Sequence, residues 1–202
     1  MTAHVRFCLA AAMILLLTAC TSPQMNYHTL VPAAAPTRSI PPAPFLIVVL
    51  PVGIPPQIDL PQLVVRQGEG RVEVLNNQRW LSALSDEIRT ALSSELVAQL
   101  NTQDISGLPR PADKPVIRVL VQIRRLDAWP GHSVQLEADW SLSQPDAERS
   151  ARLVCTNRLT DNAQGGIPHL VAAEQRVFAH LATQISTNAR LWYANLNVSC
   201  TE

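Results

Sequence analysis

The sequence predicts one α+β domain in which two helices pack on one face of a mostly antiparallel sheet. Two long segments carry apolar side chains at three- and four-residue steps, which is typical of helices that bury one face. Between these segments, other stretches alternate apolar and polar residues and are joined by short turns, as in antiparallel strands. Runs of strands set apart from helices indicate the α+β class. A length of 202 residues fits a single domain with appendages.

The N-terminus has the pattern of a bacterial lipoprotein signal. Arg6 precedes an apolar run over residues 7–17, which is too short to cross a bilayer, and Leu17-Thr18-Ala19-Cys20 follows. Small residues before a cysteine resemble the lipobox, where the signal peptidase cuts before the lipid-bearing cysteine. We therefore predict a signal peptide over 1–19 and acylation, palmitate included, at Cys20. Thr21, where an aspartate would mean inner-membrane retention, favours the periplasmic face of the outer membrane.

A proline-rich stretch follows the predicted lipidation site. Residues 20–44 are predicted to form the lipidated N-terminus and a linker, because five prolines between positions 32 and 44 favour extended chain. Within this stretch, residues 26–30 are a candidate short edge strand. The folded domain is predicted over 45–202. It begins with the apolar run 45–52, which predicts a buried central strand that Pro51 ends.

The remaining elements follow in chain order. Residues 62–66 and 71–75 flank a glycine-containing loop and predict a hairpin. Residues 82–101 predict the clearest helix, because leucine and isoleucine recur along one stripe. Three strands and a second helix complete the domain, over residues 116–126, 134–142, 151–160 and 168–193. The stripe of the second helix is apolar except at Glu174.

The residues do not assemble a catalytic, metal or cofactor site. The five histidines lack the spacing of paired ligands, and Gly131-His132-Ser133 lacks the closing glycine of a nucleophile turn. Lys114, the only lysine, has no glycine loop before it that would hold a phosphate. Sixteen basic and sixteen acidic residues give zero net charge, which argues against a nucleic-acid partner. We therefore expect no enzyme, no cofactor and no metal.

Two of the four cysteines remain once Cys8 leaves with the signal peptide and Cys20 is lipidated. Cys155 and Cys200 pair in one interpretation, because the cell envelope is oxidising. The other interpretation is one buried thiol and one exposed thiol in the tail. For a bond to form, the tail must run back along the sheet. Residues 196–200 alternate and predict a short edge strand there, against the alternative of a frayed tail.

The loop over residues 55–66 is a candidate contact for a partner or for a second copy, because it is apolar and stiffened by prolines. The alternative is that Ile58 and Leu60 fold over a sheet edge. Just before the first helix, Trp80 is predicted to pack in the core and Arg79 to pair with a carboxylate.

These features together resemble a known family. Leu50-Pro51, the run from Ile58 to Arg66, and Arg79-Trp80 before a leucine-rich helix are similar to the PqiC-type family of auxiliary lipoproteins. Further matches are Tyr27-His28-Thr29-Leu30, the stretch 127–131 and the start of the last helix at 170–173. Family members serve ABC-type and MCE-protein lipid transport systems in Gram-negative envelopes.

The resemblance implies a non-enzymatic outer-membrane lipoprotein that docks the periplasmic end of the transporter and supports envelope integrity. Its partners would be an MCE-domain periplasmic protein and an inner-membrane permease. Assembly into a homo-oligomer is a further possibility. A different function is a periplasm-facing lipoprotein that itself binds a hydrophobic ligand between sheet and helices. The candidate interface residues are Ile58, Leu60, Pro61, Gln62, Arg79 and Trp80.

Overall fold

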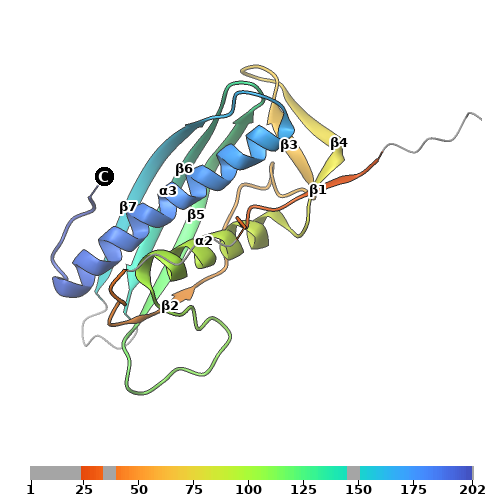
Figure 1. Cartoon of the computed structure of the whole chain (residues 1–202). Coiled ribbons are helices and arrows are strands. Elements are labelled where there is room, and N and C mark those ends of the chain that lie inside the picture. Colours follow the sequence, from red (N-terminus) through yellow and green to blue (C-terminus); the bar gives the residue numbers. More distant parts are fainter. Residues whose placement is uncertain (1–23, 34–39, 145–150, 202) are drawn as a thin grey trace, which may run out of the picture.

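Both helices of the domain cover one face of a four-stranded sheet (Figure 1). The structure is a computed structural model that describes residues 24–33, 40–144 and 151–201, so the predicted signal peptide and Cys20 lie outside the described residues. The predicted α+β class is confirmed. The elements are β1 (Asn26–His28), β2 (Leu46–Val49), β3 (Gln62–Arg66), β4 (Val72–Trp80), α2 (Leu84–Leu100), β5 (Val116–Trp129), β6 (Ser133–Ser143), β7 (Arg152–Asn162) and α3 (Ile167–Ala194).

The strands form two mixed sheets rather than one. The larger sheet has the order β2-β5-β6-β7, and the smaller has the order β1-β4-β3. The predicted hairpins pair antiparallel, whereas β2 runs parallel to β5 and β1 runs parallel to β4. Antiparallel pairing therefore dominates, as expected. The parallel pairs arise because long connections return the chain to the same end of the sheet before it pairs.

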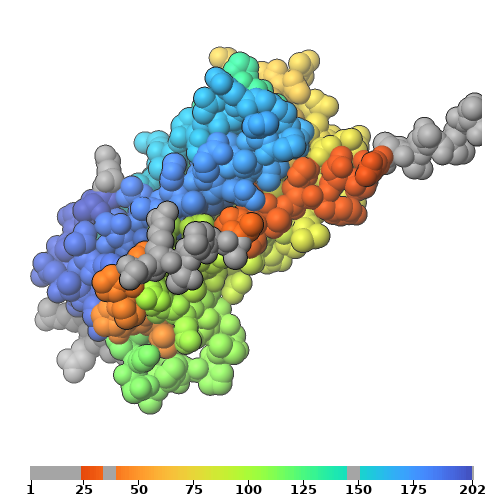
Figure 2. Space-filling model, in the orientation of Figure 1, coloured from red at the N-terminus to blue at the C-terminus, as the bar shows by residue number. Residues whose placement is uncertain are grey.

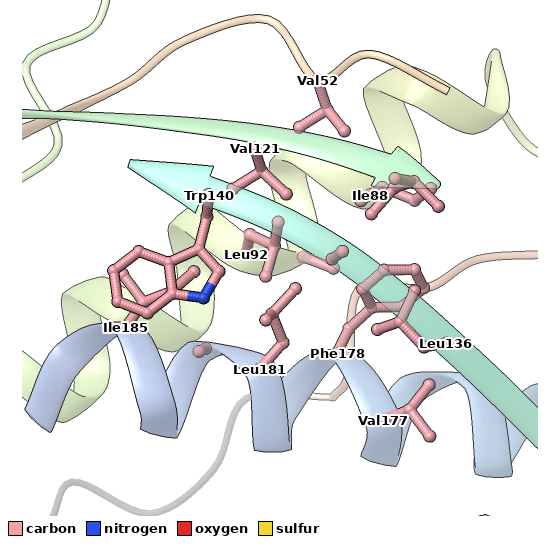
Figure 3. Packing of buried hydrophobic residues seen from close by; sticks show 14 of the residues in the cluster. Val52, Ile88, Leu92, Val121, Leu136, Trp140, Val177, Phe178, Leu181 and Ile185 are labelled. Atoms are coloured by element: carbon pink, nitrogen blue, oxygen red, sulfur yellow. The ribbon is translucent and has the colours of Figure 1, made fainter. Parts of the chain in front are cut away.

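The core lies between the two helices and the larger sheet. Leu92 of α2 and Leu181 of α3 approach each other over the sheet, and Trp140 of β6 packs beside them (Figure 3). The side chains at the helical steps predicted from the sequence are buried, including Ile88, Leu92 and Leu96 of α2. Both helices are confirmed within two residues of their expected ends. Periodicity sufficed because each helix has a single face against the sheet.

The position of β2 corrects one prediction. Its run is buried, but β2 is an edge strand and not a central one. The chain after α2 covers its free edge: Ile47 N donates to Gln103 O at 3.1 Å, and Ile105 N donates to Ile47 O at 3.0 Å. The Asp104 carboxylate fixes this segment, because it accepts the Ser93 hydroxyl at 2.6 Å and Val49 N at 3.3 Å. Because the backbone groups of this edge are already bonded, they are not free to pair with a strand of another chain.

The fold begins inside the stretch predicted as a linker. β1 pairs with β4 as the predicted edge strand, and Leu30 is fully buried in the core. The buried Glu87 carboxylate holds this segment, since it accepts Thr29 Oγ1 at 2.7 Å, Leu30 N at 2.9 Å, Ser82 N at 3.1 Å and Ser82 Oγ at 2.7 Å. Burial raises the pKa of Glu87, but these hydrogen bonds together outweigh it and keep the pKa below its usual value.

A disulfide joins the C-terminal tail to the sheet. Cys155 of β7 is buried, Cys200 is exposed, and their Cα atoms lie 5.8 Å apart. The tail forms a turn rather than the edge strand predicted over 196–200. The side chain of Asn188 on α3 binds its main chain instead: Thr201 N donates to Asn188 Oδ1 at 2.9 Å, and Asn188 Nδ2 donates to Thr201 O at 3.1 Å. A helix therefore takes the hydrogen bonds that a neighbouring strand would have used.

Candidate functional site

The six candidate interface residues gather at one end of the domain, where the chain enters β3 beside the end of β4. Gln62 is paired with Arg79, and Trp80 N donates to Pro61 O at 2.9 Å. A register shift makes this possible. Leu63 pairs with Leu75, while the preceding residue pairs four positions further along β4, so that residues 76–78 bulge out of the pairing. The β3–β4 hairpin and β1 are next to each other in Figure 1.

Two of the six residues point inward. Trp80 is buried as predicted, and the half-buried Ile58 packs against the core. Both line a cavity of about 10 Å³ between the hairpin, β5 and the two helices. Ile58 therefore takes the alternative arrangement, in which it folds onto the domain. Leu60 and Gln62 are half-buried and Pro61 is exposed, so these three form the accessible part of the set.

Within the described residues, Arg79 forms no ion pair with a carboxylate, so the predicted pairing is not found there. Its Nε is buried, and no hydrogen-bond acceptor of these residues meets it. A buried carboxylate nearby on the sequence, Glu87, already accepts four hydrogen bonds from Thr29, Leu30 and Ser82. The Glu87 carboxylate therefore has little acceptor capacity left for Arg79.

A buried acid completes the cavity. Glu174 of α3 lines it together with Trp80, and only 3% of the residue is exposed. No donor in the described part of the chain meets its Oε2, and burial raises the pKa of Glu174 to about 8. Burial therefore favours the neutral, protonated form of this carboxyl group near pH 7. The other lining residues are apolar, and the cavity has room for about one water molecule.

The role of Glu174 was not predicted, although the sequence carried a signal. The predicted stripe of the second helix contains this single acid among apolar residues. Periodicity thus places it in the core, but only the fold shows that no donor meets its second oxygen.

An ion-pair network around the buried Asp127 attaches the hairpin to the larger sheet next to the cavity. Asp127 of β5 accepts Arg66 Nε of β3 at 2.7 Å and is also paired with Arg125. Its neighbours Leu126 and Ala128 line the cavity. Asp127 therefore fixes the hairpin over β5, and with it the position of the loop before β3.

Other kinds of site have little support. Within residues 24–33, 40–144 and 151–201, no group of three or more His, Cys, Asp or Glu side chains is placed to hold a metal ion. No helix in the described part of the chain is long and apolar enough to cross a membrane. An open groove of about 560 Å³ lies between residues 42–46, 101–103 and Lys114, and polar side chains such as Asn101 and Thr102 form part of its wall.

Comparison with known proteins agrees with this architecture. A family model described as ABC-type transport auxiliary lipoprotein component matches residues 28–186. No curated protein matches the chain. One similar solved structure is the crystal structure of an uncharacterized protein. Its sequence is 18% identical to this chain, the TM-score is 0.64, and the match covers 82% of this chain and 99% of that one. Protein XCC0632 from Xanthomonas campestris, of the DUF330 family, is 15% identical, with a TM-score of 0.62 and coverage of 85% and 97%. At these identities the two structures show a shared fold.

Proposed function

The chain belongs to the family of ABC-type transport auxiliary lipoprotein components, and from this membership we propose that it is a non-enzymatic subunit of an ABC- and MCE-type lipid transport system. Cys20 anchors it to the periplasmic face of the outer membrane. The folded domain docks the periplasmic end of the transporter, beside an MCE-domain protein and an inner-membrane permease, and so supports envelope integrity. The observation that carries the proposal is the family match, which includes most of both sheets and both helices.

The anchor gives the first prediction. Replacing Cys20 by Ala is expected to leave the chain uncleaved or to release it from the membrane, because the acyl chains are lost. Membrane fractionation and the mass of the processed chain measure this. Cys8→Ala is the matched control, since Cys8 lies in the predicted signal peptide and carries no lipid. A Cys20→Ala chain that is processed and sediments with the outer membrane like the wild type would contradict the anchor.

The loop before β3 supports docking through its rigidity. Ile58 N donates to Pro55 O at 3.1 Å, and Asp59 N donates to Pro56 O at 3.3 Å, so the loop is already folded into turns. Prolines restrict it further. A preformed loop loses little conformational entropy when a partner binds. Leu60, Pro61 and Gln62 are the side chains that it offers.

A pair of substitutions separates docking from folding. Leu60→Asp is expected to abolish co-purification of the MCE-domain protein while shifting the free energy of unfolding by no more than about 0.5 kcal/mol, as for a surface change. Ile58→Asp is expected to destabilise the domain by about 2 kcal/mol or more, because it places a charge against the core. Co-purification from detergent-solubilised membranes and chemical denaturation measure the two effects. Normal co-purification of the Leu60→Asp chain would exclude this surface.

The packing supports docking over carriage of a ligand. A lipoprotein that holds a hydrophobic molecule between sheet and helices needs a pocket of several hundred Å³. The cavity bounded there by Trp80 and Glu174 holds about 10 Å³. The groove of about 560 Å³ beside the start of β2 is large enough, but it is open, and Lys114 and polar side chains such as Asn101 form part of its wall. Mass spectrometry of lipids that remain with the purified protein tests the alternative. One tightly bound lipid per chain would favour the carrier function.

A further inference from the structure

Three exposed apolar side chains lie on β1 or next to it. The exposed fractions of Met25, Tyr27 and Leu81 are 37%, 62% and 68%. Tyr27 lies beside Arg79 in the register of β1 and β4, and Leu81 N donates to His28 O at 2.8 Å, so Tyr27 and Leu81 are close together. Met25 is two residues before Tyr27, on the same side of the extended chain. We call them the β1 patch. In Figure 2, the red-orange segment that contains β1 runs over the surface beside the yellow of β4.

The length of chain before the patch restricts what it can meet. Only residues 21–24 separate Cys20 from Met25. Even fully extended, this chain places the Met25 Cα at most about 18 Å from the Cα of the lipid-bearing residue. The C-terminal tail lies at the opposite end of the domain (Figure 1). If Cys20 carries lipid, as the proposed function states, β1 is the part of the fold that the anchor holds against the bilayer.

We propose that the β1 patch rests in the headgroup region of the membrane to which the chain is anchored, so that the domain stands on this end. The inference depends on the lipidation in the proposed function. Its chemistry fits a lipid surface, because a tyrosine ring prefers the membrane–water interface, with its hydroxyl in the wet layer, and Met and Leu add apolar area.

The tether explains why so small a patch suffices. Three side chains would bind a free protein to a membrane only weakly. The anchor makes the contact intramolecular, and the effective concentration across a short linker is in the millimolar range. The patch therefore sets the orientation of the domain, while the acyl chains supply the affinity.

The test uses one fluorescent probe on the full lipidated chain. In the mature lipidated protein Cys155 and Cys200 are bonded, so a cysteine introduced by Leu81→Cys is the single free thiol and takes an environment-sensitive dye. Leu108→Cys is the matched control, because Leu108 is 65% exposed. It lies beyond the far end of α2, a helix of 17 residues that is roughly 25 Å long and begins just after position 81. The proteins are placed in phosphatidylethanolamine and phosphatidylglycerol vesicles that carry a nitroxide on the upper acyl chain.

The expected result is that the dye at position 81 shifts to the blue and loses roughly half of its emission to the nitroxide lipid, while the dye at position 108 is unaffected. Equal quenching at both positions, or none at either, overturns the proposal. Shielding at position 81 from an aqueous quencher without lipid quenching also overturns it, because another copy of the chain would then cover the patch. Vesicle flotation separates the two claims. A chain that floats but is not quenched removes only this inference, whereas one that does not float removes the anchor as well.

Discussion

Replacing Cys200 by Ser is expected to lower the free energy of unfolding by about 4 kcal/mol, the value that the chain-entropy model gives for the 45-residue separation of Cys155 and Cys200. The bond restricts the unfolded chain, and its loss returns that freedom. Cys200 is the better position to change, because it is exposed, whereas Cys155 is buried among core side chains. Denaturant unfolding under oxidising conditions measures the difference.

The reduced wild-type protein is the control for this experiment. Its stability should match that of the Cys200→Ser chain, because both lack the bond and keep the rest of the tail. A smaller loss is expected from Thr201→Ala, because the hydrogen bonds between the main chain of Thr201 and the side chain of Asn188 remain. A Cys200→Ser protein within about 1 kcal/mol of the oxidised wild type would mean that the bond does not constrain the unfolded chain as the model requires.

The helices and the antiparallel strands were predictable because each depends on a local pattern. The stripe through Ile88 and Leu92 needs one buried face, and the alternation in β6 needs one wet face, whichever strands lie next to it. The turn at Gly131, which has a φ of 77°, was likewise visible as Trp129-Pro130-Gly131. Local chemistry dictates these features, so the sequence alone contains them.

Long-range contacts explain what could not be predicted. The run 45–52 is apolar enough for a central strand, but a loop 55 residues further along the chain closes its edge, through Asp104 bonded to Val49 N. No local pattern announces that contact. The tail shows the same limit, because the alternation in 196–200 suits a strand, while the folded chain brings Asn188 to its main chain first.

The sequence indicated which residues come together at the candidate site, but not which of their side chains face outward. The family resemblance grouped Ile58 through Gln62 with Arg79-Trp80, and the structure brings these segments into contact. Which of them face outward depends on the three-residue bulge in β4 and on the hairpin lying over β5, where Arg66 pairs with Asp127. Ile58 and Trp80 consequently meet Glu174, a residue more than ninety positions away from either.

Glu174 makes the stability of the domain depend on pH in an unusual direction. The pKa of its carboxyl group is raised by burial to about 8 in the folded state, from an ordinary value of 4.5. Between these values the folded chain holds a proton that the unfolded chain releases, so this group's contribution to stability falls as the pH rises through that window. Relative to low pH, the raised pKa of Glu174 lowers the free energy of unfolding by roughly 3 kcal/mol at pH 7.

Glu174→Gln is therefore expected to stabilise the protein by roughly 3 kcal/mol at pH 7 and to change its stability little near pH 4.5, where the acid is protonated in both states. Glu87→Gln is the matched control, because the hydrogen bonds from Thr29, Leu30 and Ser82 lower the pKa of that buried acid. Its negative form stabilises the fold above its ordinary pKa, so its replacement should be destabilising at pH 7. Unfolding free energies of the three chains between pH 4.5 and 8 measure both effects. A gain for Glu174→Gln that does not grow with pH would show that Glu174 is not held protonated, and that water or a movement of the β3–β4 hairpin reaches it.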